Sequence, residues 1–287
     1  MKIIFSRKGF DSSEKYGQVA SPIFSDGSMV SLPIPSDEAG SIPYGEISTA
    51  IDIDTLGPLV TDLTRFRQPR YRRNATSKAH LDPDLDSDAL PRRHGWLPIF
   101  GQSEAAQSHL ANQEVTKGDL FLFYGWFREV ELLKEGYTFI PGAPDRHVIF
   151  GWLQIGAVCD AGPRGKATAP EWAQYHAHYA NEWKNNKVYI ASEKLDGIGL
   201  HKSVAGGGVF RKFSNKRCLT APGQTLRSVW LLPNCFSPLS FTYHGDKKRW
   251  SSREEGNHLQ TVSKGQEFVI DTAKCPEVIP WVRNLFA

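Results

Sequence analysis

Several features that would assign this 287-residue sequence to a particular class of protein are scarce or missing. No apolar run approaches the ~18 residues that a membrane helix needs, and the run Ile3–Phe5 is far too short for a signal peptide. The formal net charge is only +3, which excludes the strong global basic field typical of many nucleic-acid-binding proteins. We therefore expect a cytoplasmic protein with no membrane partner, whose binding properties depend on local clusters.

The cysteines are too scattered for a zinc knuckle. None lies two to four residues from another, which is the spacing that structural zinc sites use. We expect reduced core thiols, as in other cytosolic proteins. The four residues are Cys159, Cys218, Cys235 and Cys275.

Familiar catalytic motifs are also missing. The sequence has no G-x-S-x-G elbow, no H-E-x-x-H pair, no G-x-G-x-x-G after a strand and no Walker A pattern. The serine hydrolase, zincin, Rossmann and P-loop classes are therefore not indicated. The sequence does not name a cofactor.

The residues that are present predict an α+β fold. Hydrophobic residues make up 40% and charged residues 23% of the chain, as in ordinary globular proteins. Asp26 and Gly27 lie between two apolar-alternating runs and predict a tight β-hairpin near the N-terminus. Apolar runs predict buried strands, and apolar residues at helical spacing predict helices. Strands are expected at 2–5, 119–127, 148–158 and 265–271, and helices at 103–113, 170–184 and 276–286.

One order of elements resembles PUA-like β-barrels and their EVE and YTH relatives. A helix is followed by a Lys-Gly-Asp turn, by an apolar strand containing Phe-Tyr-Gly, and by a second apolar strand with internal glycines. The resemblance covers about residues 100–212 and implies a barrel that captures a flipped or single-stranded base. We expect one compact domain over residues 1–287, with the polar residues 61–98 as a long surface segment.

Three aromatic side chains stand where the mouth of such a barrel would be. Tyr124, Trp126 and Phe127 end the first apolar strand, and stacking of a base on one such ring contributes about 1–3 kcal/mol. We therefore include them in a predicted nucleotide site. The alternative is that Trp126 and Phe127 pack the rim of the barrel.

The loop after the first strand combines cations, hydroxyls and a carboxylate around Gly9. A loop of this composition at a strand end suits a phosphate or a nucleotide. The alternative is a polar surface loop with local caps. The candidate nucleotide ligands are Ser6, Arg7, Lys8, Asp11 and Ser12.

Amide and imidazole side chains surround the predicted helix 103–113. An amide donates and accepts hydrogen bonds together, which suits the edge of a base. We therefore add Gln102, Gln107 and His109 to the predicted nucleotide site. The alternative is that they are solvated helix residues.

Residues 65–73 are rich in arginine, with Phe66 and Tyr71 between the cations. Such a pattern is typical of contacts to a nucleic-acid backbone. The acids of residues 82–88 could instead neutralise these charges within the protein. The predicted backbone contacts are Arg65, Arg67, Arg70, Arg72 and Arg73.

The motif His-Leu-Asp-Pro-Asp at residues 80–84 is a candidate for chemistry. Pro83 keeps the preceding backbone extended, which can place Asp82 and Asp84 on one side. Two carboxylates with His80 nearby can bind Mg²⁺ or share acid–base work, so these three are the predicted catalytic residues. A metal site needs ligands from elsewhere, which the sequence does not name, so no metal is assigned. The alternative is a capped turn with solvated acids.

His176 and His178 lie two residues apart in the predicted helix 170–184. Their side chains would point about 200° apart in a regular helix, so they could not both bind one metal ion. We interpret one of them as a buried structural histidine.

Several longer strings together resemble one domain family. They are FSRKGFDSS, SPIFSDGSMVSLPIP, HLDPDL, FGQSEAAQSHLANQ, GDLFLFYGWFR, HVIFGWLQIG and GQEFV. As a set they are similar to the third type of nucleotide modification associated domain, over most of the chain. The resemblance implies a bacterial or phage base-modification system, with nucleic acid or nucleotides and other proteins of that system as partners. It implies no particular reaction.

Three functions follow as hypotheses. The protein recognises a nucleobase or nucleotide in a base-modification or defence system, or it modifies or hydrolyses one with the cluster His80, Asp82 and Asp84, or it is an interaction protein without a pocket. Geometry separates the first two. If the N-terminal loop and residues 80–84 meet beside one pocket, an enzyme is favoured, and if they lie on opposite faces, a binding module is favoured.

Overall fold

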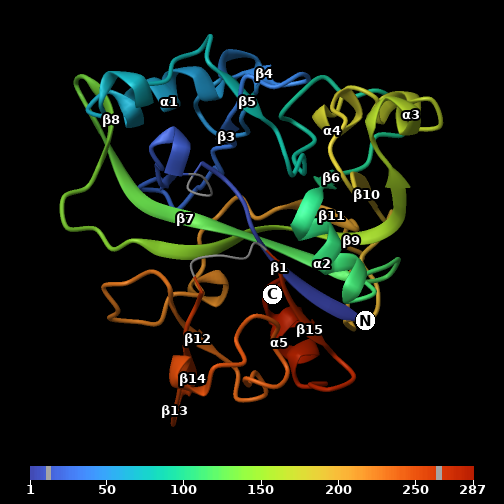
Figure 1. The fold of residues 1–287 in the computed structure, drawn as a ribbon. Coiled ribbons are helices and arrows are strands. Elements are labelled where there is room, and N and C mark those ends of the chain that lie inside the picture. Colours follow the sequence, from blue (N-terminus) through green and yellow to red (C-terminus); the bar gives the residue numbers. More distant parts are fainter. Residues whose placement is uncertain (11–13, 263–266) are drawn as a thin grey trace.

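A nine-stranded mixed sheet crosses the middle of the molecule (Figure 1). The structure is a computed structural model that describes residues 1–10, 14–262 and 267–287, so the predicted ligands Asp11 and Ser12 lie outside the described residues. The main path of the sheet has the order β15-β1-β7-β9-β10-β6, and β2, β8 and β11 pair beside it. The strands are β1 (Lys2–Arg7), β2 (Ser21–Ile23), β6 (Ile99–Gln102), β7 (Leu120–Leu133), β8 (Gly136–Phe139), β9 (Arg146–Asp160), β10 (Lys187–Ala191), β11 (Gly207–Val209) and β15 (Glu267–Asp271).

The N-terminal strand β1 lies inside the sheet, with a partner strand on each edge, and both of its faces are apolar. In β1, Ile3 and Ile4 are fully buried, as expected for a strand that is covered on both sides. β1 runs parallel to β7 on one edge and antiparallel to β15 on the other. The loop that follows β1 therefore begins between β7 and the first residue of β15, since Arg7 pairs with Tyr124 and Ser6 with Glu267.

Two small antiparallel sheets lie on either side of the large one (Figure 1). The upper sheet, with helix α1 beside it, contains the strand that ends at His80. The upper strands are β3 (Ile34–Pro35), β4 (Ile42–Pro43) and β5 (Lys78–His80), and the lower ones are β12 (Val229–Leu232), β13 (Trp250–Arg253) and β14 (Gly256–Gln260).

The helices are short and lie around the edges of the sheets. The α-helices are α1 (Leu56–Thr64), α2 (Glu104–Asn112), α3 (Gly162–Lys166), α4 (Ala177–Ala180) and α5 (Val278–Asn284). The 3-10 turns are η1 (Glu14–Tyr16), η2 (Tyr44–Glu46), η3 (Pro69–Tyr71), η4 (Glu171–Ala173), η5 (Asn215–Arg217) and η6 (Lys247–Arg249). None of the described helices is long and apolar enough to cross a membrane.

The main apolar core takes side chains from both ends of the chain, from Ile3 to Leu285. Phe5 lies at its centre, where its ring packs 5.9 Å from Trp230 and 6.0 Å from Phe236, measured between ring centroids. Aromatic pairs at this separation and at an angle are favourable beyond the area that they bury. The C-terminal part of the chain therefore helps to hold the strand that leads into the N-terminal loop.

The α+β class is confirmed, but the PUA-like barrel is not. Among the described strands the main path of the sheet has two ends, β15 and β6, and no barrel closes between them. The predicted hairpin turn is present, since the amide of Phe24 donates to the carbonyl of Ser28 over 2.8 Å. The predicted helix at 103–113 is also present as α2.

Two further predictions need correction. Residues 61–98 are not a surface segment throughout, because Asp84 and Leu85 are buried and β5 lies within them. The prediction of four reduced thiols is wrong for two of them, since Cys235 and Cys275 form a disulfide. The two cysteines are 40 residues apart in the sequence, so their pairing could not be predicted from local spacing and arises only in the folded chain.

Candidate functional site

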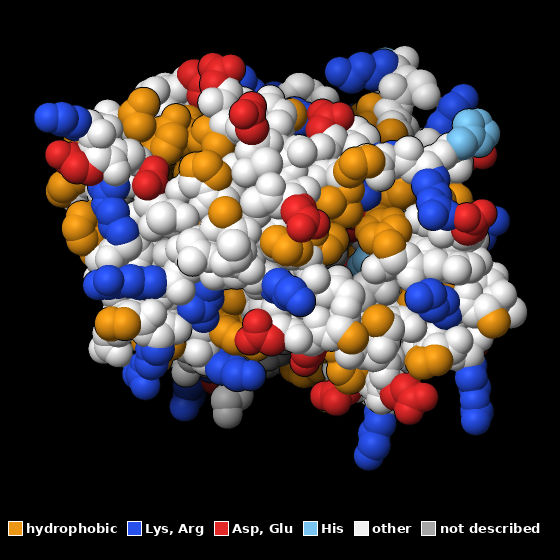
Figure 2. Space-filling model, turned by 90° about the horizontal axis from the view of Figure 1, so that it is seen from above, with side chains coloured by type: hydrophobic (Ala, Val, Ile, Leu, Met, Phe, Trp, Pro, Cys, Tyr) orange, Lys and Arg blue, Asp and Glu red, His pale blue; other side chains and the backbone are white. Residues whose placement is uncertain are grey.

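The N-terminal loop and the His-Leu-Asp-Pro-Asp motif meet at one cavity of about 320 Å³. Lys8 lines it from the end of β1, and His80 and Asp82 line it from the end of β5. The same cavity is bordered by Trp183 and by the start of α2. Seen from above, the surface is hollowed, and pale-blue histidine atoms are visible at the bottom of the hollow (Figure 2). This convergence is the geometry that favours an enzyme.

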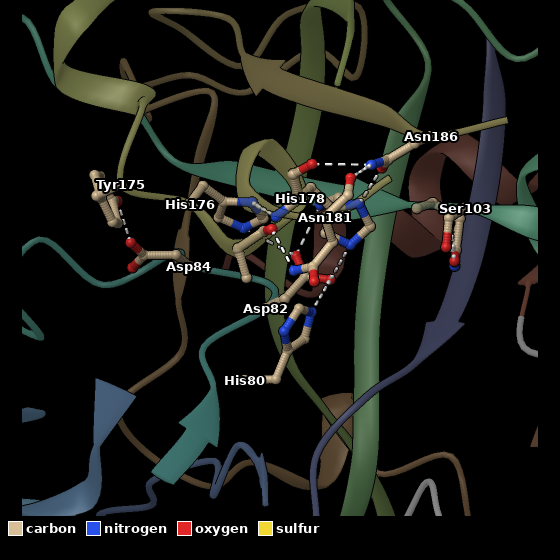
Figure 3. A network of polar contacts seen from close by, with 12 residues as sticks. His80, Asp82, Asp84, Ser103, Tyr175, His176, His178, Asn181 and Asn186 are labelled. Atoms are coloured by element: carbon tan, nitrogen blue, oxygen red, sulfur yellow. Dashed lines mark hydrogen bonds and ion pairs between the residues drawn. The ribbon is translucent and has the colours of Figure 1, made fainter. Parts of the chain in front are cut away.

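Three imidazoles surround the carboxylate of Asp82 (Figure 3). The Nε2 atoms of His80 and His178 each lie 3.7 Å from Asp82 Oδ2. The Nε2 atom of His176 lies 3.4 Å from Asp82 Oδ1. These distances are too long for good hydrogen bonds, which place the heavy atoms about 2.7–3.2 Å apart.

The two oxygens of Asp82 have different surroundings. Oδ1 accepts a hydrogen bond of 2.7 Å from the backbone amide of Gly101 in β6 and faces His176. Oδ2 accepts no hydrogen bond from the described residues and faces His80 and His178. The carboxylate is thus held by one oxygen, and the other is presented to two imidazoles.

The hydrogen bonds of Asn186 determine the tautomer of His178. The Nδ2 group of Asn186 donates to the carbonyls of His178 and Asn181, at 2.9 and 3.0 Å. Its Oδ1 must then be the acceptor in the 2.6 Å contact with His178 Nδ1. His178 therefore carries its proton on Nδ1, and a neutral ring presents the lone pair of Nε2 to Asp82.

The pKa values of this pair are consistent with an anion beside a neutral imidazole. Burial lowers the pKa of His178 to about 3, although Asp82 opposes the shift. Burial alone would raise the pKa of Asp82, but its contacts with His176 and His80 outweigh this and hold that pKa well below its usual value. Near neutral pH, two electron-pair donors therefore face each other across 3.7 Å.

Two histidines that the sequence prediction separated are brought together because the helix between 170 and 184 is interrupted. The chain forms only η4 and α4 there, and His176 is the extended N-cap residue of α4. Its Nδ1 accepts from the amide of His178 at 3.4 Å. The assumption of a regular helix was wrong, and both rings point toward Asp82 (Figure 3).

Gly101 allows the ring of His178 to approach β6. A Cβ atom at Gly101 would lie 2.2 Å from Cδ2 of His178, which is closer than real atoms come. The lack of a side chain at this point of the strand therefore leaves room for the imidazole beside the Asp82 carboxylate. A strand glycine often has this role, where another group comes close to the backbone.

Asp84 belongs to a different environment, although the sequence analysis grouped it with Asp82. It is completely buried, and its oxygens accept two hydrogen bonds from Arg92, at 2.7 and 2.6 Å. The hydroxyl of Tyr175 also donates to it. In Figure 3, Asp84 points away from the imidazoles toward Tyr175. The structure therefore does not bring Asp84 into the candidate site.

Part of the predicted nucleotide site surrounds a second buried acid, Glu267. Its Oε1 atom accepts from Ser6 Oγ at 3.0 Å and from Gln102 Nε2 at 2.6 Å, and it lies 3.4 Å from the ammonium of Lys8. Arg7 points the other way because neighbouring residues of a strand alternate between its faces. Ser6, Lys8 and Gln102 thus gather around an acid that was not predicted.

The other predicted polar residues near α2 lie farther from the imidazoles. The Oε1 atom of Gln107 accepts from the hydroxyl of Tyr189 at 2.8 Å, within the core. The ring of His109 packs at a tilt against that of Tyr243, with centroids 4.4 Å apart, and its Nε2 lies 3.4 Å from Thr242 Oγ1. Neither residue lines the cavity.

The three aromatic residues of the expected barrel mouth are part of the packing. Tyr124 and Phe127 are buried, and the ring of Tyr124 packs edge-on against Trp230 at 4.9 Å. Trp126 donates to Asp145 at 2.8 Å and carries the guanidinium of Arg227 on its ring. None of the three lines the cavity of the imidazoles.

The arginine-rich segment follows α1, and several of its guanidinium groups bind backbone carbonyls. Arg65 donates to Glu135 and Arg67 to Gln18, while Arg72 and Arg73 donate to carbonyls within the segment itself. The aromatic ring between the first two arginines, that of Phe66, is 82% exposed. Arg70 lies over the ring of Tyr71.

The sequence prediction missed His176, His178 and Glu267 as parts of the site. A signal was available for the histidines. The sequence contains His-x-His at 176–178 and His-x-Asp at 80–82, and in an extended backbone the two outer residues of each pattern lie on the same side and can bind one ion together. No comparable signal marks Glu267, which occupies an ordinary strand.

The family of the chain is shown by a comparison with protein-family profiles. The profile of nucleotide modification associated domain 3 matches residues 2–271, which is nearly the whole chain and includes the imidazole cluster. No curated protein and no solved structure matches the chain. The matched range also contains both segments that form the cavity. The chain therefore belongs to the nucleotide modification associated domain 3 family.

Proposed function

We propose that this protein is a metal-dependent enzyme that modifies a nucleotide or a nucleobase, with the metal ion held by His80, Asp82 and His178. One observation carries the proposal. The lone pair of His178 Nε2 faces the free carboxylate oxygen of Asp82 across 3.7 Å, with no hydrogen between them. Two electron-pair donors in this arrangement repel each other unless a cation lies between them.

The spacing of the donor atoms suits a small divalent ion. One ligand atom from each of His80, Asp82 and His178 lies within 4.8 Å of the others. Bonds of about 2.0–2.2 Å to a zinc ion place tetrahedral ligands about 3.5 Å apart. A small inward movement of the side chains would therefore close the set around one ion.

The surroundings of these side chains support the proposed metal binding. Metal-binding histidines usually donate their second ring nitrogen to an oxygen, which orients the ring. Asn186 accepts such a bond from His178 at 2.6 Å. The Gly101 amide donates to the other oxygen of Asp82, so it positions the carboxylate and leaves Oδ2 to the metal.

The open cavity favours a catalytic site over a structural one. Structural zinc sites are closed by four protein ligands, whereas catalytic sites have three and keep a position for water or substrate. Here the three donors border a cavity of about 320 Å³. Two histidines and one carboxylate serve both Zn²⁺ hydrolases and non-haem Fe(II) oxygenases, and a metal bound in this way polarises the substrate or activates a bound water.

The family supports the choice of substrate, and the arginine-rich segment supports a polymeric form of it. Nucleotide modification is the association that defines the family. Arginines beside an exposed aromatic ring suit a sugar–phosphate backbone and an unstacked base, and Phe66 is 82% exposed beside Arg65 and Arg67. We therefore retain Arg65 to Arg73 as the proposed contact to a nucleic-acid strand.

The metal content of the purified protein tests the proposal. Wild-type protein, stripped and then loaded anaerobically with Fe²⁺ or Zn²⁺, should retain one ion per chain by mass spectrometry of the metal. His80→Ala and His178→Ala should weaken the affinity by more than about 100-fold, because changes outside the ligand shell already cost 10–100-fold.

A matched histidine outside the site is the control for this experiment. His94→Ala removes an exposed imidazole from the neighbouring loop and should bind metal as the wild type does. Equal metal binding by all of these proteins would contradict the proposed site. Oligonucleotides are then incubated with the Fe²⁺-loaded and the Zn²⁺-loaded protein, and their digested nucleosides are analysed by mass spectrometry. The metal that supports modification shows whether the chemistry is hydrolytic or oxidative.

A further inference from the structure

Lys8 is a nearly buried cation at the cavity of the imidazole cluster. Its side chain is 11% exposed, and its ammonium lies over the ring of Phe100, 4.6 Å from the centroid. The backbone at Lys8 extends the sheet, since its amide donates to the carbonyl of Tyr124 at 2.9 Å. Gly125 leaves room for it, because a Cβ atom there would lie 2.7 Å from the Lys8 carbonyl oxygen.

Glu267 holds the ammonium of Lys8 in place and leaves the hydrogen-bonding capacity of that ammonium available. The carboxylate is 1% exposed, and its Oε1 already accepts from Ser6 and Gln102. Lys8 Nζ lies 3.4 Å from that atom, which is an ion pair but a long contact for a hydrogen bond. Among the described residues no acceptor forms a hydrogen bond with the three ammonium protons. The cation is thus positioned and still available to a ligand.

The charges around the cavity assign a clear role to Lys8. It is the only lysine or arginine among the described residues that line the cavity. The two acids at its rim, Glu38 and Glu104, are exposed, so water screens them. Inside, the anion of Asp82 faces the metal position. A negatively charged group in the cavity therefore finds two cations, the bound metal and Lys8.

Resting on the proposed function, we propose that Lys8 binds a phosphate oxygen of the nucleotide at the metal centre, and that Glu267 is the residue that positions Lys8. A lysine ammonium is a compact point charge that suits phosphate. Held in advance by Glu267 and 11% exposed, it stabilises negative charge more strongly than a fully solvated lysine would. The substrate class is accordingly a phosphorylated nucleotide or a nucleotide within a strand, and a free base or nucleoside is excluded.

The test uses the full-length protein loaded with Co²⁺, whose visible absorption reports on ligands that bind at or beside the metal. Inorganic phosphate and 2′-deoxyadenosine 5′-monophosphate are titrated into the wild type, Lys8→Met and Lys8→Arg. Lys8→Met should bind Co²⁺ within about threefold of the wild type but phosphate at least 10-fold more weakly. Lys8→Arg should recover part of the affinity, because it restores the charge.

Matched variants separate a local effect from a general one. Lys134→Met removes an exposed lysine from the β7–β8 turn and should bind phosphate normally. Glu267→Gln keeps the shape of the side chain and should weaken phosphate binding less than Lys8→Met does. If Lys8→Met does not fold, the double variant Lys8→Met with Glu267→Gln removes both charges together and takes its place.

The outcomes distinguish this inference from the proposed function. If the wild type binds Co²⁺ and Lys8→Met binds phosphate equally well, the role of Lys8 is overturned and the metal site stands. If the wild type binds no Co²⁺, the metal site fails. Calorimetric titration of phosphate into the metal-free proteins then tests Lys8 alone, and equal affinities of wild type and Lys8→Met would overturn it.

Discussion

Asp82 and Asp84 are separated by one residue, yet they lie in two opposite kinds of environment. Asp84 is completely buried and receives two hydrogen bonds from Arg92 and one from Tyr175. Asp82 is buried to a similar degree but faces three imidazoles at 3.4–3.7 Å, and one of its oxygens accepts no hydrogen bond from the described residues. Figure 3 shows the two side chains pointing in different directions.

The difference teaches how to separate a structural acid from a functional one. A buried carboxylate with a bidentate arginine is satisfied by the protein itself, so nothing else is required. A buried carboxylate that faces electron-pair donors is not satisfied. Such a group keeps an oxygen open to a bound cation, whose binding then stabilises the folded protein.

The largest effect is expected from the substitution Asp82→Asn. It keeps the shape but removes the charge, so the metal should be lost almost completely, and nucleotide modification with it. Metal content and product formation measure the two losses. The apo protein should lose much less stability than Asp84→Asn does, as measured by thermal melting, because Asp82 has no bidentate arginine partner that would be left buried and unpaired. A strongly destabilised Asp82→Asn protein with intact metal binding would make Asp82 structural, like Asp84.

The next effect concerns Asp84→Asn, which should destabilise the fold and leave the metal site intact. Removing one partner of a buried ion pair leaves the other charge uncompensated and costs about 3–5 kcal/mol. Arg92 is the charge left behind, and its side chain is only 12% exposed. Urea unfolding measures the loss, with Asp88→Asn, at a more exposed acid, as the control. Loss of metal binding per folded molecule would contradict the comparison.

A smaller effect is expected from Asn186→Ala, which removes the group that orients His178. The imidazole should lose its preferred tautomer, and the affinity for metal should fall by about 10–100-fold. Titration with Co²⁺ measures the change. Asn185→Ala, next to it but with its amide directed to Ser108, is the matched control. An unchanged affinity in Asn186→Ala would mean that His178 is not a ligand.

The smallest effect concerns the pH dependence of the metal-free protein. Because the pKa of His178 is lowered from 6.5 to about 3, the unfolded chain takes up a proton below pH 6.5 that the folded chain does not. The free energy of unfolding should therefore fall as the pH is lowered from about 6.5 toward 3, by at most about 1.4 kcal/mol per pH unit for this one group. His178→Gln should show a shallower fall than the wild type.

The histidine His94 again provides the control for this measurement, because it is exposed. His94→Ala should keep the slope of the wild type. Burial also lowers the pKa values of His147 and of His244, the latter to about 4, so part of the fall should remain in every variant. A slope in His178→Gln equal to that of the wild type would show that His178 is not buried in its neutral form.

Much of the architecture could be predicted from local patterns. The apolar run of β7 and the Asp26–Gly27 turn appear where periodicity and turn chemistry place them. The prediction of a barrel was wrong, because the order of strands along the chain does not specify whether the two edge strands of a sheet pair with each other. The disulfide between Cys235 and Cys275 joins positions 40 residues apart, and nothing local marks such a pair.

The sequence by itself determined the candidate residues His80, Asp82, Lys8 and Gln102, because their residue types and their positions at predicted turns and strand ends indicate polar chemistry. Only the tertiary structure decided how they are grouped. It separated Asp84 from Asp82 by placing Arg92 beside one and imidazoles around the other. It also added His178 and Glu267 from distant segments. The physical reason is that a site is a set of distances between atoms, and those distances arise only when the core brings the strand ends together.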